Sequence, residues 1–176
     1  EHWWRMSAID ALGPLDEHLH FVMDRDWWIK YLLRFGLAGI ETSSDIVANF
    51  RLHGQSKTVG SSDSFKIERD AYFHGLAAHY GLTSTAARLA EDASTYRPLN
   101  LPEEPDLKIL TRAFNHYFLL RADEAYVKGD HAGVKQWLNA VKYPDLPSED
   151  AAFYGKLQRR STLPPSVVKW ARRLRS

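Results

Sequence analysis

The sequence has no cysteine, no long apolar run and no recognisable targeting segment. With none of its 176 residues cysteine, disulfides and cysteine-ligated metals are excluded, which fits a reducing compartment. No apolar run approaches the roughly 20 residues that a helix needs to cross a bilayer. The chain opens on Glu1-His2-Trp3 without an initiator Met or a signal peptide, and we interpret it as a fragment that begins inside a fold.

Acidic residues are absent from one end of the chain. Residues 151–176 contain seven Lys or Arg and no Asp or Glu, although the whole chain carries a net charge of only +1. A basic end on an acidic body favours a polyanionic neighbour, either anionic lipid or nucleic acid. As a helix, 166–175 places Trp170 among apolar residues on one side and basic residues around the other, which is typical of a short interfacial helix. The alternative is a solvated helix whose Trp170 packs on the preceding helices.

Two carboxylates stand two residues apart at the start of an apolar, helix-periodic stretch. Asp26 suits the N-cap of a helix that runs to residue 35 and stops at Gly36. Asp24 then lies before the helix, after three apolar residues, where partial burial would raise its pKa toward that of a general base. The alternative is that both are surface acids at a helix N-terminus.

The rest of the chain is predicted to be mainly helical. Short strands are expected at 37–41 and 46–52, followed by a polar loop at 54–58. The remaining segments are expected to be helical, with helices at 6–12, from Ser62 or Asp63 to 80, at 84–93, 106–128, 130–142, from Ser148 and at 166–175. The Pro-rich connector at 98–105 is the expected boundary, and 106–142 is expected to form an αα-hairpin with a corner like that of tetratricopeptide helix pairs.

Four separate motifs carry a family resemblance. In order along the chain they are 4–5 (WR), 11–17 (ALGPLDE), 23–30 (MDRDWWIK) and 50–58 (FRLHGQSKT). Together they resemble the C-terminal part of a family-2 glycosyltransferase of the GT-A fold. The resemblance implies an α+β, mainly α chain with a GT-A edge at 1–60, a helical connector at 61–104 and a helical extension at 105–176. The nucleotide-binding half, with its Asp-x-Asp motif, would lie before residue 1.

The same resemblance assigns roles to residues. It places the catalytic base of an inverting transfer on Asp24, with Met23 standing where many members of the family have Glu. It places a contribution to metal or donor diphosphate binding on His53. Substrate binding is expected from a set of aromatic and charged residues in the four motifs, namely Trp4, Arg5, Asp26, Trp27, Arg51 and Lys57.

The implied partners follow from this activity. They are a nucleotide-sugar donor, a glycan, lipid-linked or protein acceptor, and Mg²⁺ or Mn²⁺ bound mainly through the missing half. We expect a cytoplasmic protein, peripheral at the inner face of an anionic membrane, and no nucleic-acid partner. Of Trp27 and Trp28, one is expected to be buried and the other to face the acceptor.

Two other functions remain open at this point. His18 and His20 on a strand would share a face and, with Asp24, could hold a metal, as in a metal-dependent hydrolase. Alternatively, the helical half is an interaction module and the chain has no catalysis of its own.

Overall fold

The structure is a computed structural model that describes residues 4–42, 62–90 and 96–162. These residues form seven α-helices, one short 3₁₀ helix and no strand, so the described part of the chain is mainly α, as predicted. The chain divides into two compact units, Glu1–Asp106 and Leu107–Ser176. The boundary lies just after the predicted connector, whereas the assignment of 1–60 to a GT-A edge stays a prediction.

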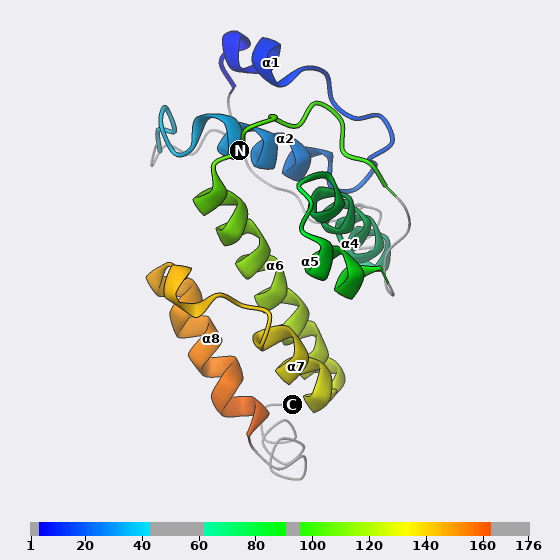
Figure 1. Cartoon of the computed structure of the whole chain (residues 1–176), viewed down its shortest axis with the longest axis vertical. Coiled ribbons are helices and arrows are strands. Elements are labelled where there is room, and N and C mark those ends of the chain that lie inside the picture. Colours follow the sequence, from blue (N-terminus) through cyan, green and yellow to red (C-terminus); the bar gives the residue numbers. More distant parts are fainter. Residues whose placement is uncertain (1–3, 43–61, 91–95, 163–176) are drawn as a thin grey trace, which may run out of the picture. The chain divides into compact units, whose positions relative to one another are not determined.

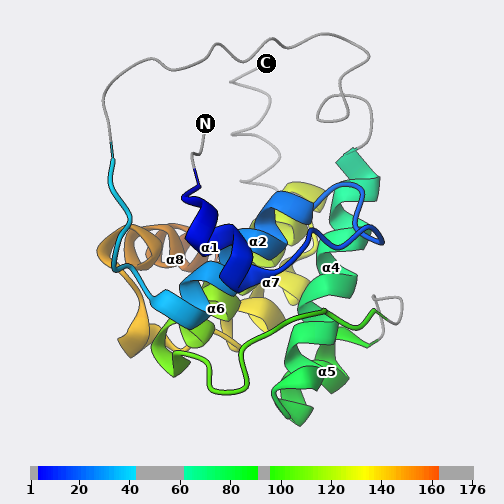
Figure 2. The same ribbon diagram turned by 90° about the horizontal axis from the view of Figure 1, so that it is seen from above.

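The first unit contains α1 (Met6–Leu12), α2 (Met23–Phe35), α4 (Ser62–His79) and α5 (Thr83–Leu89). Both α1 and α2 end at glycines with positive φ, Gly13 and Gly36, as the sequence predicted. α5 packs against α4 (Figure 2). The apolar core of this unit comes from all four helices and from the stretch before α2, through Leu12, Leu19, Val22, Ile29, Leu33, Ala71, Tyr72, Phe73, Leu76, Ala77 and Leu89.

The strand expected at 37–41 is wrong. Residues 36–39 form turns in which Gly36 and Gly39 both have positive φ, and the amide of Ile40 donates to the carbonyl of Leu37. Two left-handed glycines so close together bend the backbone away from the extended conformation that a strand needs. The second expected strand, 46–52, and the loop at 54–58 lie outside the described residues.

A segment without helix or strand, 96–106, completes the first unit. It crosses α4 at Gly75, where an added Cβ would lie 2.3 Å from the carbonyl oxygen of Tyr96. Farther along, the Tyr80 hydroxyl donates to the carbonyl of Pro102 at 3.0 Å, and the amide of Asp106 donates to the carbonyl of Leu33 at 3.0 Å. This segment is therefore held along its length by α4 and by the end of α2.

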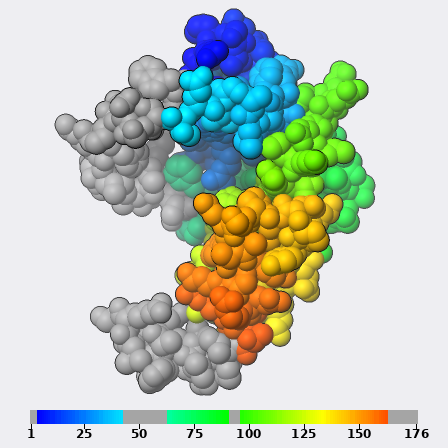
Figure 3. All heavy atoms as spheres, turned by 90° about the vertical axis from the view of Figure 1, so that its left-hand side faces the viewer, coloured from blue at the N-terminus to red at the C-terminus, as the bar shows by residue number. Residues whose placement is uncertain are grey.

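The second unit contains α6 (Leu107–Lys128), α7 (His131–Leu138), the 3₁₀ helix η1 (Tyr143–Asp145) and α8 (Ser148–Ser161). α7 and α8 both pack against α6 and against each other (Figure 1). In Figure 3 the yellow and orange residues of α7 and α8 form one continuous body. The αα-hairpin and the cap of α7 are confirmed, because the Asp130 side chain accepts a hydrogen bond from the Gly133 amide at 2.9 Å.

Aromatic and amide side chains join the helices of the second unit. Phe118 stacks on Trp137 with ring centroids 6.0 Å apart, and the Arg121 guanidinium lies 4.8 Å from the Trp137 ring. The buried Asn115 side chain both donates to the carbonyl and accepts from the amide of Lys142, at 3.1 and 2.9 Å. α7 ends at Leu138, four residues earlier than predicted. The predicted helix 166–175 lies outside the described residues.

Candidate functional site

The first turn of α2 contains Asp24, on which the family resemblance places the catalytic base, and Asp26. The helix begins at Met23, with Val22 at the N-cap and no side-chain cap. Asp24 is therefore the second helical residue and is exposed, with one carboxylate oxygen accepting a hydrogen bond from the amide of Arg25 at 2.8 Å. The prediction that Asp24 precedes the helix and is partly buried is wrong. Its carboxylate is instead open to solvent beside the positive end of the helix dipole.

Asp26 is buried, whereas the sequence analysis predicted burial for Asp24. Its side chain is completely buried and accepts a hydrogen bond from the Lys30 ammonium, one helical turn on, at 2.6 Å. Burial raises the pKa of Asp26, although the Lys30 hydrogen bond and charge oppose the shift. The prediction that Asp26 caps the helix is wrong, since its side chain bonds to Lys30 rather than to the free amides of the first turn. Its predicted role in substrate binding stays a prediction.

Tyr72, from α4, adds a third polar group to this buried site. Its side chain is fully buried, and burial, followed by the charge of Asp26, raises the pKa of its hydroxyl well above the usual value. The hydroxyl is near enough to the Asp26 carboxylate to lower the pKa of that group. Among the described residues, however, neither Asp26 Oδ1 nor the Tyr72 hydroxyl has a hydrogen-bond partner of normal geometry.

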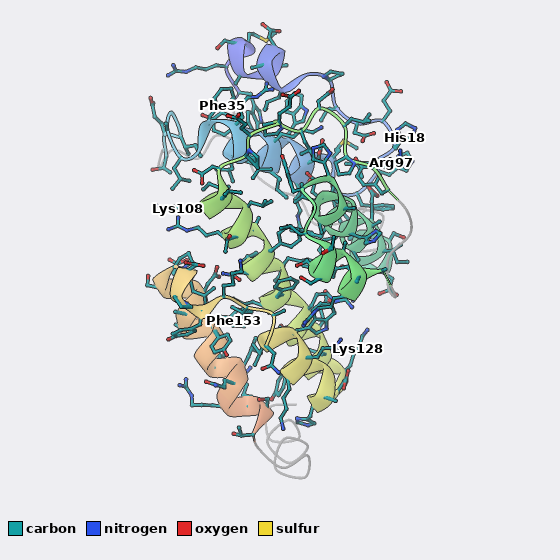
Figure 4. All side chains as sticks on the ribbon, viewed as in Figure 1. His18, Phe35, Arg97, Lys108, Lys128 and Phe153 are labelled. Atoms are coloured by element: carbon teal, nitrogen blue, oxygen red, sulfur yellow. The ribbon has the colours of Figure 1, made fainter. Side chains whose placement is uncertain are left out.

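Asp16 forms a second buried carboxylate site, in the stretch before α2. It accepts hydrogen bonds from the Tyr96 hydroxyl and from the backbone amide of His18, and its Oδ1 lies 3.0 Å from the His18 Nδ1. Burial raises the pKa of Asp16, but these hydrogen bonds outweigh it and leave the pKa below its usual value. Burial and the bond to Asp16 raise the pKa of Tyr96. His18, labelled in Figure 4, is exposed.

Glu68 on α4 holds the backbone that leads into α2. Its carboxylate accepts hydrogen bonds from the amide of His20 at 2.7 Å and from the amide of Phe21 at 2.9 Å. The Phe21 ring meets the ring of Phe65, one turn before Glu68, with centroids 5.0 Å apart. Sequence reasoning missed Glu68, because a glutamate that binds backbone amides 47 residues away leaves no local pattern.

Trp4 and Trp27, both predicted to bind substrate, lie together in an aromatic cluster. The Trp4 ring contacts those of Trp27, Trp28 and Tyr31, with centroids 5.6, 4.7 and 5.5 Å apart. Trp27 and Trp28 are both partly exposed, so the expectation that one of them is buried is wrong. Arg5 is exposed and lies 3.6 Å from Glu41, also exposed. The structure thus brings the Trp4 ring, from the stretch before α1, into contact with the Trp27 ring on α2.

Two arginines lie near the start of α2. Burial lowers the pKa of Arg25, and the positive charge of Arg69 on α4 lowers it further. Arg69 in turn pairs with its neighbour Asp70 at 2.8 Å, and both side chains are buried. Of the two, the Arg25 guanidinium is the one that interacts electrostatically with the exposed Asp24.

The remaining predicted residues are not brought into this site. Arg51, His53 and Lys57 lie outside the described residues. The strand that would place His18 and His20 on one face does not form, because residues 17–22 form turns and bends. That prediction is therefore wrong. Within the part of the chain that the structure describes, no group of three His, Asp or Glu side chains could hold a metal ion.

Comparisons with protein-family models, curated proteins and solved structures find nothing that matches this chain. Among the described helices, none is both long and apolar enough to cross a bilayer.

Proposed function

We propose that this chain is the acceptor-side part of an inverting family-2 glycosyltransferase. The observation that carries the proposal is the order and spacing of the four sequence motifs, which include 23–30 on α2. Two structural features support it. Asp24 is exposed at the start of α2, and the partly exposed aromatic rings of the same helix resemble the surfaces on which sugar rings stack.

In the proposed reaction Asp24 acts as general base. Its carboxylate takes the proton of an acceptor hydroxyl while the oxygen attacks the anomeric carbon of a nucleotide sugar from the face opposite the departing diphosphate. One C–O bond forms, one breaks and the configuration inverts. Positive charge near the leaving group would come from Arg51, Lys57 and a divalent cation, with His53 contributing to its binding.

The acceptor is proposed to be a glycan, a lipid-linked sugar or a protein, at the inner face of a membrane. The basic residues of 151–176 would favour anionic headgroups there, at about 1 kcal/mol for each nearby Lys or Arg.

The decisive experiment compares Asp24→Asn with Asp63→Asn in the longer protein to which we assign this chain. Asp63 is a matched control, since it is likewise an exposed acid in the first turn of a helix. With a panel of nucleotide sugars and Mg²⁺ or Mn²⁺, Asp24→Asn should lower turnover by about 10²-fold or more while donor affinity holds, because only proton abstraction is lost. Loss of donor affinity at normal turnover would make Asp24 a donor ligand instead.

His53→Ala tests the proposed contribution of His53 to metal binding. It should raise the divalent cation concentration needed for half-maximal activity, and an unchanged requirement would remove His53 from the metal site.

A second candidate function is an interaction module without catalysis. It is favoured by the compact αα-hairpin and α8, which have a core of their own. Absence of turnover above background with every donor tested, in wild type as well as in Asp24→Asn, would favour this alternative.

A further inference from the structure

The N-terminus of α2 is not held by a capping side chain. Val22 occupies the N-cap position, and its side chain is apolar and makes no capping hydrogen bond. Helix ends fray, because the first amides of a helix have no acceptor within it, and a side-chain cap normally opposes this. Asp24 is the second residue of the helix and therefore lies in the turn that would fray first.

Glu68, on α4, holds the two peptide groups that precede this turn. Its carboxylate accepts hydrogen bonds from the His20 amide at 2.7 Å and from the Phe21 amide at 2.9 Å. Hydrogen bonds to an ionised acceptor are stronger than those between neutral groups. The Phe21 ring also meets the ring of Phe65, one turn before Glu68 on the same helix. A backbone contact and a side-chain contact thus join α4 to the residues directly before the N-cap of α2.

The path from these amides to Asp24 is short. Two residues separate Phe21 from Asp24, and the first of them, Val22, is buried and accepts a hydrogen bond at its carbonyl from the Asp26 amide at 3.0 Å. A change in the direction of the Phe21 peptide therefore passes through Val22 into the first turn. Because Asp24 is exposed and its carboxylate bonds to the Arg25 amide of the same turn, its position follows that of the turn.

We propose that Glu68 is a positioning residue, which holds the His20 and Phe21 amides, fixes the first turn of α2 and so directs Asp24 toward the acceptor. This inference rests on the proposed function, in which Asp24 takes the acceptor proton. Glu68 itself touches neither donor nor acceptor, and it acts on Asp24 through the backbone that it binds.

The kinetic test compares Glu68→Ala, which removes both carboxylate oxygens, with Glu68→Gln, which keeps one acceptor oxygen, in the longer protein to which we assign this chain. Turnover should fall by about 10- to 100-fold in Glu68→Ala at unchanged KM for donor and acceptor, because a misplaced base slows the chemical step without removing a binding group. The fall should be smaller in Glu68→Gln. The control is Leu76→Ala, at a fully buried apolar position on the same helix, which should lower the melting temperature and leave turnover of the folded protein intact.

Amide hydrogen exchange gives a second readout that does not depend on transferase activity. The Asp26 amide donates to the carbonyl of Val22 at the start of α2, and the Gly36 amide donates to the carbonyl of Leu32 at its end, at 2.9 Å. Glu68→Ala should speed exchange at Asp26 by about 10-fold or more and leave exchange at Gly36 unchanged, because only the first turn loses its contact with α4. A merely structural role would speed exchange at both amides by the same factor.

The outcomes separate the two proposals. Where Asp24→Asn has lost turnover, full turnover in a folded Glu68→Ala protein would overturn the positioning role, and so would equal changes in exchange at Asp26 and Gly36. A rise in KM that accounts for the loss of activity would also overturn it, since Glu68 would then contribute to binding. If Glu68→Ala does not fold, Glu68→Gln is measured in its place against the same outcomes. Normal turnover in Asp24→Asn refutes the proposed base instead, and exchange at Asp26 then decides whether Glu68 holds the first turn.

Discussion

Asp24 and Asp26 share the first turn of α2, yet one carboxylate is exposed to solvent and the other is completely buried against the Lys30 ammonium. Two residues of one type, two positions apart, therefore have opposite surroundings.

Asp26→Asn should destabilise the first unit strongly. It leaves the Lys30 ammonium buried without a counter-charge, which costs about 3–5 kcal/mol, whereas the exposed Asp24→Asn should change the free energy of unfolding by about 0.5 kcal/mol or less. Chemical denaturation followed by tryptophan fluorescence measures both. A loss of about 1 kcal/mol or less for Asp26→Asn would fit a simple helix cap and contradict the buried pair.

Glu68→Ala should loosen the entry into α2. It removes the acceptor of the exposed His20 amide and of the partly buried Phe21 amide, and leaving the partly buried donor without an acceptor costs about 1–3 kcal/mol. Glu68→Gln keeps one acceptor oxygen and should cost less. Amide hydrogen exchange at Phe21, faster in Glu68→Ala than in Glu68→Gln, is the sharper measurement. The exposed Glu103→Ala, on the segment 96–106, is the control. Equal effects of the two Glu68 variants would mean that the charge matters rather than the hydrogen bonds.

Alkaline pH should destabilise the first unit. Burial raises the pKa of Tyr72 and Tyr96, and raises that of Tyr80 to about 12. The unfolded chain then loses these protons first, near pH 10, so stability is full below that pH and is lost as pH rises through the folded values. Tyr80→Phe should make the loss between pH 10 and 12 shallower by up to about 1.4 kcal/mol per pH unit. Denaturation at a series of pH values checks this, and an identical slope in Tyr80→Phe would contradict it.

Gly75→Ala and Gly155→Ala should have effects of opposite sign. At Gly75 the new Cβ would meet the Tyr96 carbonyl and Pro98, and such overpacking costs about 1–3 kcal/mol. At Gly155 on α8 the nearest atom is the flexible end of Arg159 at 3.6 Å, so alanine should stabilise that helix by up to about 1 kcal/mol. Thermal unfolding of the two variants gives the comparison. Stabilisation by Gly75→Ala would mean that the segment 96–106 lies farther from α4.

Local signals in the sequence were enough to predict most helices, but not which aspartate is buried. Gly13, Gly36 and Asp130 mark helix ends through their own conformational and capping preferences, and the helices end or begin where these residues predict. By contrast, the burial of Asp26 depends on Lys30 and Tyr72, and Tyr72 comes from a helix 46 positions later. The partners of Asp16 and Glu68 are similarly non-local. The spacing of apolar residues and the capping residues reflect interactions between residues near each other in the sequence. The contacts of these acids form only when the helices pack.

The Asn115 side chain, which bonds both the amide and the carbonyl of Lys142, has a consequence for sequence variation. A carboxamide carries the same donor and acceptor as a peptide group, so Asn115 supplies what a neighbouring backbone would supply in a sheet. On the side of α6 this side chain holds the turn from α7 to α8, and on the side of α8 the Tyr143 ring of the turn meets the Tyr154 ring with centroids 5.1 Å apart. Because both hydrogen bonds go to the backbone of Lys142, they leave the identity of that side chain unconstrained, and selection on the link between α6 and the turn falls on the amide of Asn115.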